Sequence, residues 1–263
     1  MFKKRIIPIV LIKENIVVQS IRFNKYLPIG KPEIVIENLD RWGADEIVII
    51  DISSANKKNR EPNFQLLKKI GSMGIETPLA YGGGVNNALE AKEIIQTGFE
   101  RVSITHSFFY ENKGKDLLES TAKIIGAQAI ILSLPVKYVS KKFYLYNYGS
   151  KKIEKINFSN LIESKNLFSE LLLMDADNEG IDGGFNEKIY SFFEKKIQNN
   201  LLLFGGLNQD LQILKYLKKK NVMGIGIGNF LNYKEHALQN IKKFLIKKKF
   251  KMIRNQEYKK NII

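Results

Sequence analysis

Eight short runs of apolar residues recur along the whole chain, and this repetition limits the folds that it can adopt. Most runs are continuous in Val, Ile and Leu, which is typical of parallel strands covered by helices. Segments with the spacing of amphipathic helices lie between them. The predicted strands are 5–12, 46–52, 77–81, 101–104, 129–134, 170–175, 201–204 and 223–228. The predicted helices are 34–42, 88–96, 117–125, 158–167, 186–197, 209–218 and 233–246.

Eight strand-and-helix units in 263 residues match the size of a (β/α)8 TIM barrel, which takes about 250 residues. The competing fold is a doubly wound open sheet, which usually carries a G-x-G-x-x-G turn after its first strand. Here that strand runs into Lys13-Glu14-Asn15 instead. No linker or shift in composition divides the chain, so we predict one barrel over residues 1–250 and a basic C-terminal tail over 251–263.

The two halves of the chain resemble each other. The segment 46–51 matches 170–175 at a spacing of 124 residues, 78–83 resembles 201–206, and 103–108 resembles 226–230. These matches predict a duplicated half-barrel. Such a duplication would place two related ligand sites on opposite sides of one barrel mouth.

The composition excludes several classes of site. Cysteine is absent, and His106 and His236 are the only histidines, so disulfides and thiolate ligands are excluded and a multi-histidine metal site is not expected. We predict no metal, no other cofactor and a cytoplasmic protein. No apolar segment approaches the ~20 residues that a membrane span needs.

The net charge of +15 raises the question of nucleic-acid binding. Much of the excess lies in lysine-rich stretches such as 218–220 and 247–249, which are typical of solvated helix faces and tails. No nucleic-acid recognition motif accompanies them, so we predict no nucleic-acid partner. An anionic sugar nucleotide, a membrane surface or an acidic protein stays open as a partner.

Glycine turns follow two of the predicted strands, at the end of the barrel where TIM-barrel active sites lie. Glycine lets backbone N–H groups approach an anion closely, and the following helix adds its positive N-terminus. The simpler interpretation is a set of tight turns without a ligand. Because two such turns occur, each paired with a small-residue strand end one unit later, we predict an anionic, phosphate-bearing small molecule there. The predicted binding residues are Gly82, Gly83, Gly84, Ser103, Thr105, Gly180, Gly205, Gly206, Gly228 and Asn229.

Several of these stretches resemble the cyclase subunit of imidazole glycerol phosphate synthase, the HisF-type barrel. The resemblance rests on Arg5-Ile6-Ile7-Pro8, 43–52, 78–84, Val102-Ser103-Ile104 and the later glycine turns. It implies a barrel that joins a glutaminase, receives ammonia along its axis and uses two aspartates to close an imidazole ring. The implied substrate is a ribonucleotide with a phosphate at each end.

The chain departs from that family where the chemistry would take place. The two catalytic aspartates of the family would fall at Leu11 and Pro135, which cannot exchange a proton. Gln19, Ile181 and Phe204 replace further polar residues of the family. The remaining candidates for acid–base chemistry are Asp51, Asp177 and Glu179, with Asp175 beside them, although aspartates at strand ends also cap helices.

Four charged residues stand at the starts of predicted strands one, two, four and six. By resemblance, Arg5, Glu46, Arg101 and Glu170 form the gate through which ammonia enters the barrel. From the residues alone, a closed salt-bridge plug that seals the core is an equal possibility. The resemblance favours the gate.

A divergent subfamily resembles this chain more closely: the HisF-like proteins of surface-sugar biosynthesis, which help to convert an acetamido into an acetamidino group. The local signs are Leu11 before Lys13, Tyr26 and Gly30 within 23–32, and 78–84. The implied partners are a HisH-like glutaminase at the N-terminal barrel face and an ATP-dependent sugar amidotransferase. A genuine imidazole-forming cyclase that uses other carboxylates is the alternative, and a pure binding protein is a third possibility.

Overall fold

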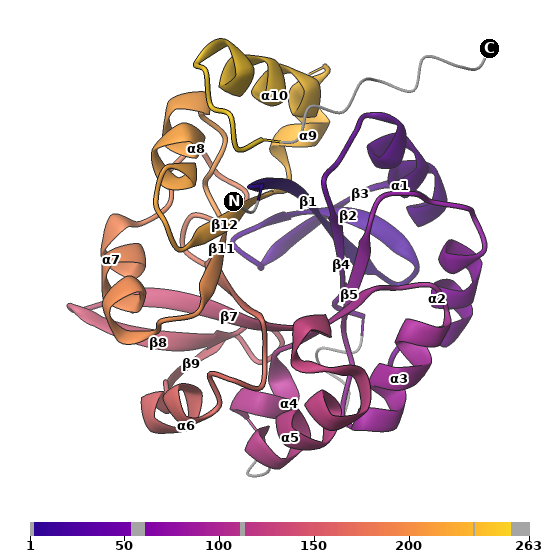
Figure 1. Cartoon of the computed structure of the whole chain (residues 1–263), viewed down its shortest axis with the longest axis vertical. Helices are drawn as coiled ribbons and strands as arrows, with labels where there is room; N and C mark the ends of the chain where they lie inside the picture. Colours follow the sequence, from indigo (N-terminus) through magenta and orange to yellow (C-terminus); the bar gives the residue numbers. More distant parts are fainter. Residues whose placement is uncertain (1–2, 54–60, 111–113, 234, 254–263) are drawn as a thin grey trace.

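A computed structural model describes residues 3–53, 61–110, 114–233 and 235–253. Eight parallel strands close into a barrel in the order β1-β4-β5-β6-β7-β10-β11-β12, and β12 pairs with β1 (Figure 1). The strands are β1 Arg5–Lys13, β4 Ile47–Asp51, β5 Leu79–Gly82, β6 Arg101–Ile104, β7 Ile130–Val139, β10 Glu170–Asp175, β11 Asn200–Phe204 and β12 Val222–Ile227. The predicted (β/α)8 barrel is therefore confirmed.

Helices surround the barrel on its outer side (Figure 1). Asn63, Asn87, Asn157 and Asn186 each accept a backbone N–H bond at a helix start, which explains where four of the helices begin. The helices are α1 Pro32–Arg41, α2 Phe64–Gly71, α3 Ala88–Gln96, α4 His106–Phe109, α5 Gly114–Ile125, α6 Phe158–Glu163, α7 Glu187–Lys196, α8 Asp210–Leu217, α9 Phe230–Tyr233 and α10 Ala237–Lys247, with the 3-10 turn η1 Ala127–Ala129. The sequence did not predict α2.

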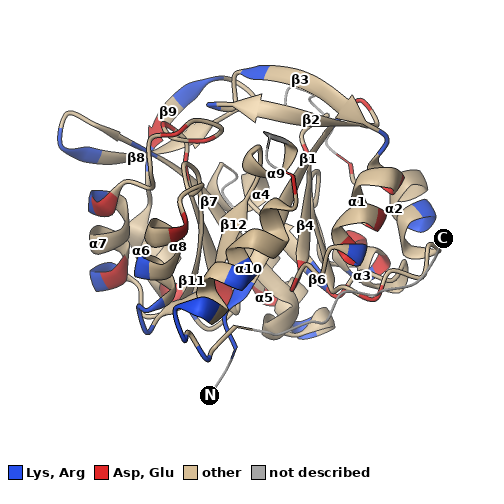
Figure 2. Ribbon diagram, turned by 90° about the horizontal axis from the view of Figure 1, so that it is seen from above, with Lys and Arg blue, Asp and Glu red and all other residues tan. Residues whose placement is uncertain are grey.

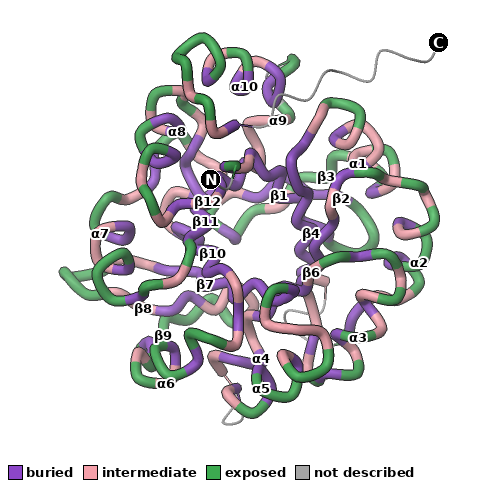
Figure 3. The backbone as a smooth tube through the Cα atoms, in the orientation of Figure 1, coloured by how far each residue is buried: buried purple, intermediate pink, exposed green. Residues whose placement is uncertain are grey.

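Side chains alternate along each strand between two apolar layers. On β1, Ile6 belongs to the large cluster between strands and helices, whereas Ile7 belongs to a second cluster inside the barrel. The inner cluster also holds Val48 and Leu172, and all three residues are almost fully buried. Figure 3 shows the strands of the barrel wall as buried. Because both faces of the strands are buried, their sequences are continuously apolar.

Two antiparallel extensions cover the mouth of the barrel. β2 Ile16–Ile21 and β3 Lys25–Gly30 form a hairpin after β1 that crosses the top of the barrel (Figure 2). β8 Lys142–Asn147 and β9 Lys152–Lys155 extend β7 as further antiparallel strands. The β1–β2 and β7–β8 connections each turn through two residues of positive φ, Glu14-Asn15 and Ser140-Lys141, as the right-handed strand twist requires.

The first and last described segments of the chain lie side by side. The Lys4 N–H donates to the Met252 carbonyl at 2.8 Å, and buried Ile253 forms a bridge with Lys4. Residues 254–263 of the predicted tail lie outside the described residues. Within the described part of the chain, no helix is long and apolar enough to span a membrane.

Candidate functional site

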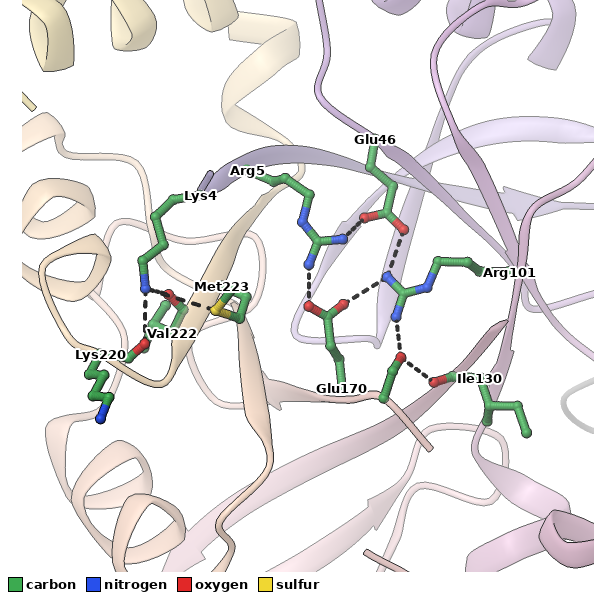
Figure 4. A network of polar contacts seen from close by, with 10 residues as sticks. Lys4, Arg5, Glu46, Arg101, Ile130, Glu170, Lys220, Val222 and Met223 are labelled. Carbon is green, nitrogen blue, oxygen red and sulfur yellow. Dashed lines mark hydrogen bonds and ion pairs between the residues drawn. The ribbon is translucent and has the colours of Figure 1, made fainter. Parts of the chain in front are cut away.

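A ring of four alternating charges closes the N-terminal end of the barrel (Figure 4). Glu46 accepts from Arg5 at 2.5 Å and from Arg101 at 3.0 Å, and Glu170 accepts from Arg101 at 2.7 Å and also from Arg5. Arg101 Nη2 donates to Ser169 Oγ at 2.7 Å. The structure thus brings together all four residues that the sequence singled out for the gate.

Burial and charge oppose each other in this ring. Burial acts to lower the pKa of Arg101, but the carboxylates of Glu46 and Glu170 outweigh it, so that its pKa is raised. Glu46 is 2% exposed, and above the ring lie the apolar side chains of the inner cluster. In this structure the ring is closed, and only movement of the charged side chains would open it.

The first predicted glycine turn surrounds a pocket at the opposite end of the barrel. Gly82, Gly83, Gly84, Ser103 and Thr105 all line it. Gly83 has a φ of +136°, and a Cβ there would lie 2.4 Å from the Asp51 carbonyl oxygen. Only glycine fits at this position, because any Cβ would collide with the backbone at the end of β4.

The second glycine turn repeats this geometry in the other half of the barrel. Gly205 has a φ of +114°, and its Cβ would lie 2.6 Å from the Asp175 carbonyl oxygen. Gly180, Gly206, Gly228 and Asn229 line the same pocket. The pairs Asp51/Gly83 and Asp175/Gly205 therefore occupy matching positions, as expected of a duplicated half-barrel.

Asp51 and Asp175 shape the loops that follow their strands. Asp51 Oδ1 accepts from the Ser53 N–H at 2.8 Å. Asp175 is fully buried and accepts from Asn178 Nδ2 and from the Asn186 N–H, both at 2.8 Å. Burial raises the pKa of Asp175, and these hydrogen bonds oppose the rise. The structure places both side chains in loop-supporting contacts.

Glu179 holds the β2–β3 hairpin in place. Its Oε2 accepts from the Ser20 hydroxyl and the Phe23 N–H, both at 2.8 Å, and its backbone carbonyl accepts from the Arg22 N–H. It is 1% exposed, and burial raises its pKa. Asn229 supports the same hairpin, since its side chain accepts from the Ser20 N–H and donates to the Ser20 carbonyl.

Asp177 is the candidate carboxylate that faces solvent at the mouth. Its side chain is 43% exposed, and it lies 3.4 Å from Lys137 Nζ. That ammonium also lies 4.4 Å from the centre of the Tyr146 ring, and Lys13 lies 4.7 Å from the Tyr26 ring. Sequence reasoning did not assign these lysines to the mouth, although each follows directly on an apolar run.

Leu11 and Pro135 stand where the resemblance places the two catalytic aspartates, and both lie in apolar surroundings. Leu11 is 4% exposed and belongs to the inner cluster together with Phe204. Pro135 stands beside Met174 in the β7–β10 register. Nearby, the hydroxyls of Ser103 and Ser133 lie 2.5 Å apart. Among the described residues, neither of these two positions carries a carboxylate itself; on the neighbouring strands, the register places Asp51 beside Ile12 and Asp175 beside Val136.

Glu179→Ala is expected to lower the free energy of unfolding by about 2 kcal/mol, because two buried donors of the hairpin lose their acceptor. Glu179→Gln keeps an acceptor oxygen without a buried charge, and we expect it to stay within about 0.5 kcal/mol of the unmodified protein. Urea unfolding measures both. Equal losses for the two variants would contradict the anchoring role.

Because the pKa of Glu179 is raised, the difference in stability between the unmodified protein and Glu179→Gln should depend on pH. A carboxyl with a raised pKa contributes most to stability below its ordinary value of 4.5, and this contribution is lost as the pH rises through the folded-state pKa. The Tm of Glu179→Gln should therefore rise relative to that of the unmodified protein between pH 4.5 and pH 7. A constant difference in Tm over this range would contradict the assignment.

Comparison with known proteins agrees with the barrel fold. A family model described as "Histidine biosynthesis protein" matches residues 5–237. "Imidazole glycerol phosphate synthase subunit HisF" of Bacillus pumilus is 27% identical over 93% of this chain and 97% of the relative. "Putative imidazole glycerol phosphate synthase subunit hisF3" of Vibrio vulnificus is 28% identical over 89% of this chain and 90% of the relative. In the described residues, no three His, Asp or Glu side chains gather as metal ligands. The chain therefore belongs to the histidine biosynthesis protein family, as a HisF-type barrel.

Proposed function

We propose that this barrel is the ammonia-receiving subunit of a glutamine-dependent amidotransferase complex. A HisH-like glutaminase would dock on its N-terminal face, and the ammonia would serve acetamidino formation on a surface-polysaccharide sugar, with an ATP-dependent sugar amidotransferase as a further partner. The carrying observation is the combination of a closed charge ring at one end with apolar residues, Leu11 and Pro135, at the other.

The chemistry of the barrel interior suits a small neutral molecule. Above the ring, Ile7, Val48 and Leu172 are almost fully buried and offer no partner to a charge. An ammonium ion would lose its hydration there at a cost of many kcal/mol, whereas neutral ammonia would lose little. Transient parting of the ion pairs and small side-chain movements would then pass ammonia while excluding ions.

The two glycine turns would hold an anionic ligand at the mouth. Each presents a bare backbone next to a pocket, and the two pockets lie in opposite half-barrels. A phosphate-bearing acceptor or cosubstrate would be bound through backbone N–H groups. Lys13 and Lys137, which stand over the Tyr26 and Tyr146 rings, are further cations at the C-terminal ends of β1 and β7.

A genuine imidazole-forming cyclase is the second candidate, and the names of the relatives favour it. Its acid–base groups would have to be carboxylates other than those of the family. Glu179, Asp175 and Asp51 already accept hydrogen bonds within the protein, so that this function would fall first to Asp177, whose side chain is 43% exposed.

The proposal predicts that the barrel stimulates a glutaminase. Mixing it with the HisH-type glutaminases of the same genome, one at a time, should raise glutamate release at least tenfold for one of them. Glu100→Arg reverses an exposed charge beside Arg101 on the N-terminal face and should weaken this stimulation at least threefold. The matched control is Lys152→Glu on β9 near the mouth, which should leave it unchanged. Stimulation of none of the glutaminases would overturn the proposal.

A second arm tests delivery to the sugar. The complex is supplied with amide-15N glutamine, an excess of 14N ammonium, ATP, the amidotransferase and an acetamido sugar. Channelled ammonia would leave 15N in the amidine nitrogen above its share in the bulk pool. An isotope ratio equal to that of the pool would show that ammonia is released before use.

A further inference from the structure

Strand β1 changes its pairing partner along its length. We call the stretch between Pro8, where pairing with β12 ends, and Leu11, where pairing with β2 begins, the seam. The β1–β12 register ends at Pro8 opposite Ile227, and the β1–β2 register begins at Leu11 opposite Val18. Between these two points β12 has ended, and the chain turns away at Gly228. The wall is therefore thinnest beside the middle of β1.

A cavity of about 180 Å³ opens at this seam. On its inner side lie residues of the inner cluster, among them Ile9 and Leu11, and on its outer side lie residues that pack between β1 and α1, among them Val10 and Leu39. An apolar cavity of about 150 Å³ in another protein holds benzene. This one therefore has room for a small ring or a chain of about six carbons.

The rim of the cavity carries two exposed apolar side chains beside the amides of Asn38 and Asn232. Trp42 is 38% exposed and Ile29 is 39% exposed, and both line the opening. Exposed large apolar side chains around a cavity are a common mark of a ligand site. Trp42 is also the single tryptophan of the chain, so that its fluorescence reports on this cavity alone.

The cavity adjoins the second glycine turn. Phe204, Gly228 and Asn229 line both the cavity and the pocket formed by Gly205 and Gly206. An anion at the turn and an apolar group in the cavity would thus be a few bonds apart. We propose that this side of the mouth binds a phosphate ester with a small apolar group, the phosphate at the turn and the apolar group in the seam. This rests on the anion binding that forms part of the proposed function.

The test compares three probes: hexyl phosphate, inorganic phosphate and hexan-1-ol. Binding is followed by Trp42 fluorescence and by calorimetry. Hexyl phosphate should bind at least tenfold more tightly than either other probe, since roughly two buried methylene groups already supply a factor of ten. It should also shift the Trp42 emission to shorter wavelength. Hexyl phosphate that binds no more tightly than inorganic phosphate would overturn the inference.

Two neighbouring residues on α1 give a matched pair of variants. Val35 lines the cavity, whereas Ile34 is 57% exposed and does not. Val35→Phe should reduce hexyl phosphate binding to the level of inorganic phosphate and leave inorganic phosphate unchanged, and Ile34→Phe should change neither. Ile29→Glu at the rim, a substitution at an exposed site, should weaken hexyl phosphate at least threefold. Full hexyl phosphate affinity in both cavity variants would place the ligand elsewhere.

The two proposals fail separately. Glutaminase stimulation is measured without any phosphate ester, so its absence would remove the ammonia-delivery function and leave the probe result standing. If inorganic phosphate binds but hexyl phosphate gains nothing, only the seam site is lost. If neither phosphate probe binds while stimulation persists, the anion turn and the seam site both fail and ammonia delivery stands.

Discussion

Glu46→Ala is expected to lower the free energy of unfolding by about 3 kcal/mol or more, because it leaves two buried arginines facing a single carboxylate. Glu46 is 2% exposed and bridges Arg5 and Arg101, whose side chains are 17% and 12% exposed. Breaking a buried ion pair from one side costs far more than the pair itself contributes. Urea unfolding followed by circular dichroism measures the loss.

The matched control is Glu37→Ala, which removes an exposed ion pair with Arg41 on α1. Exposed pairs contribute little, and we expect a change below about 0.5 kcal/mol. A loss of less than about 1 kcal/mol for Glu46→Ala would show that water already screens the ring. A ring that is screened in this way would open easily but could not exclude ions, which would weaken the case for a gate.

The sequence predicted the barrel because its strands are buried on both faces. The predicted strand 170–175 coincides with β10, and 101–104 coincides with β6. The hairpin β2–β3 was missed for physical reasons. It lies outside the closed barrel, Pro28 within β3 argues against a strand, and β3 is largely exposed. The helix α2 was missed as well.

The candidate site was only partly predictable, because some of its contacts depend on the hairpin that the sequence did not reveal. The positions of the four ring residues follow from strand starts, so sequence spacing suffices to bring them together. The role of Glu179 depends on Ser20 and Phe23, which are 159 and 156 residues away on the hairpin that sequence reasoning missed. Without the hairpin, Glu179 reads as a free carboxylate at the mouth, whereas the structure buries it as an anchor.

The largest effect is expected on imidazole glycerol phosphate synthesis, the reaction after which the relatives are named. Supplied with the family's ribonucleotide intermediate and ammonium salt, the purified barrel should form the imidazole product at least a thousandfold more slowly than "Imidazole glycerol phosphate synthase subunit HisF" of Bacillus subtilis under the same conditions. A positioned general acid or base contributes roughly 10²–10⁴-fold, and here both positions, Leu11 and Pro135, are apolar. Chromatographic detection of the product measures the rate.

The choice of ammonium salt makes this comparison decisive, because it removes any need for a glutaminase. A rate within tenfold of the relative would assign acid–base chemistry to carboxylates at new positions, and Asp177→Asn would then lower it steeply, since Asp177 is the candidate that faces solvent at the mouth. If the rate is as low as expected, Asp177→Asn changes nothing. The protein then combines a charge ring and two glycine turns with strand ends that lack the groups that move protons, which is the arrangement that the proposed function predicts.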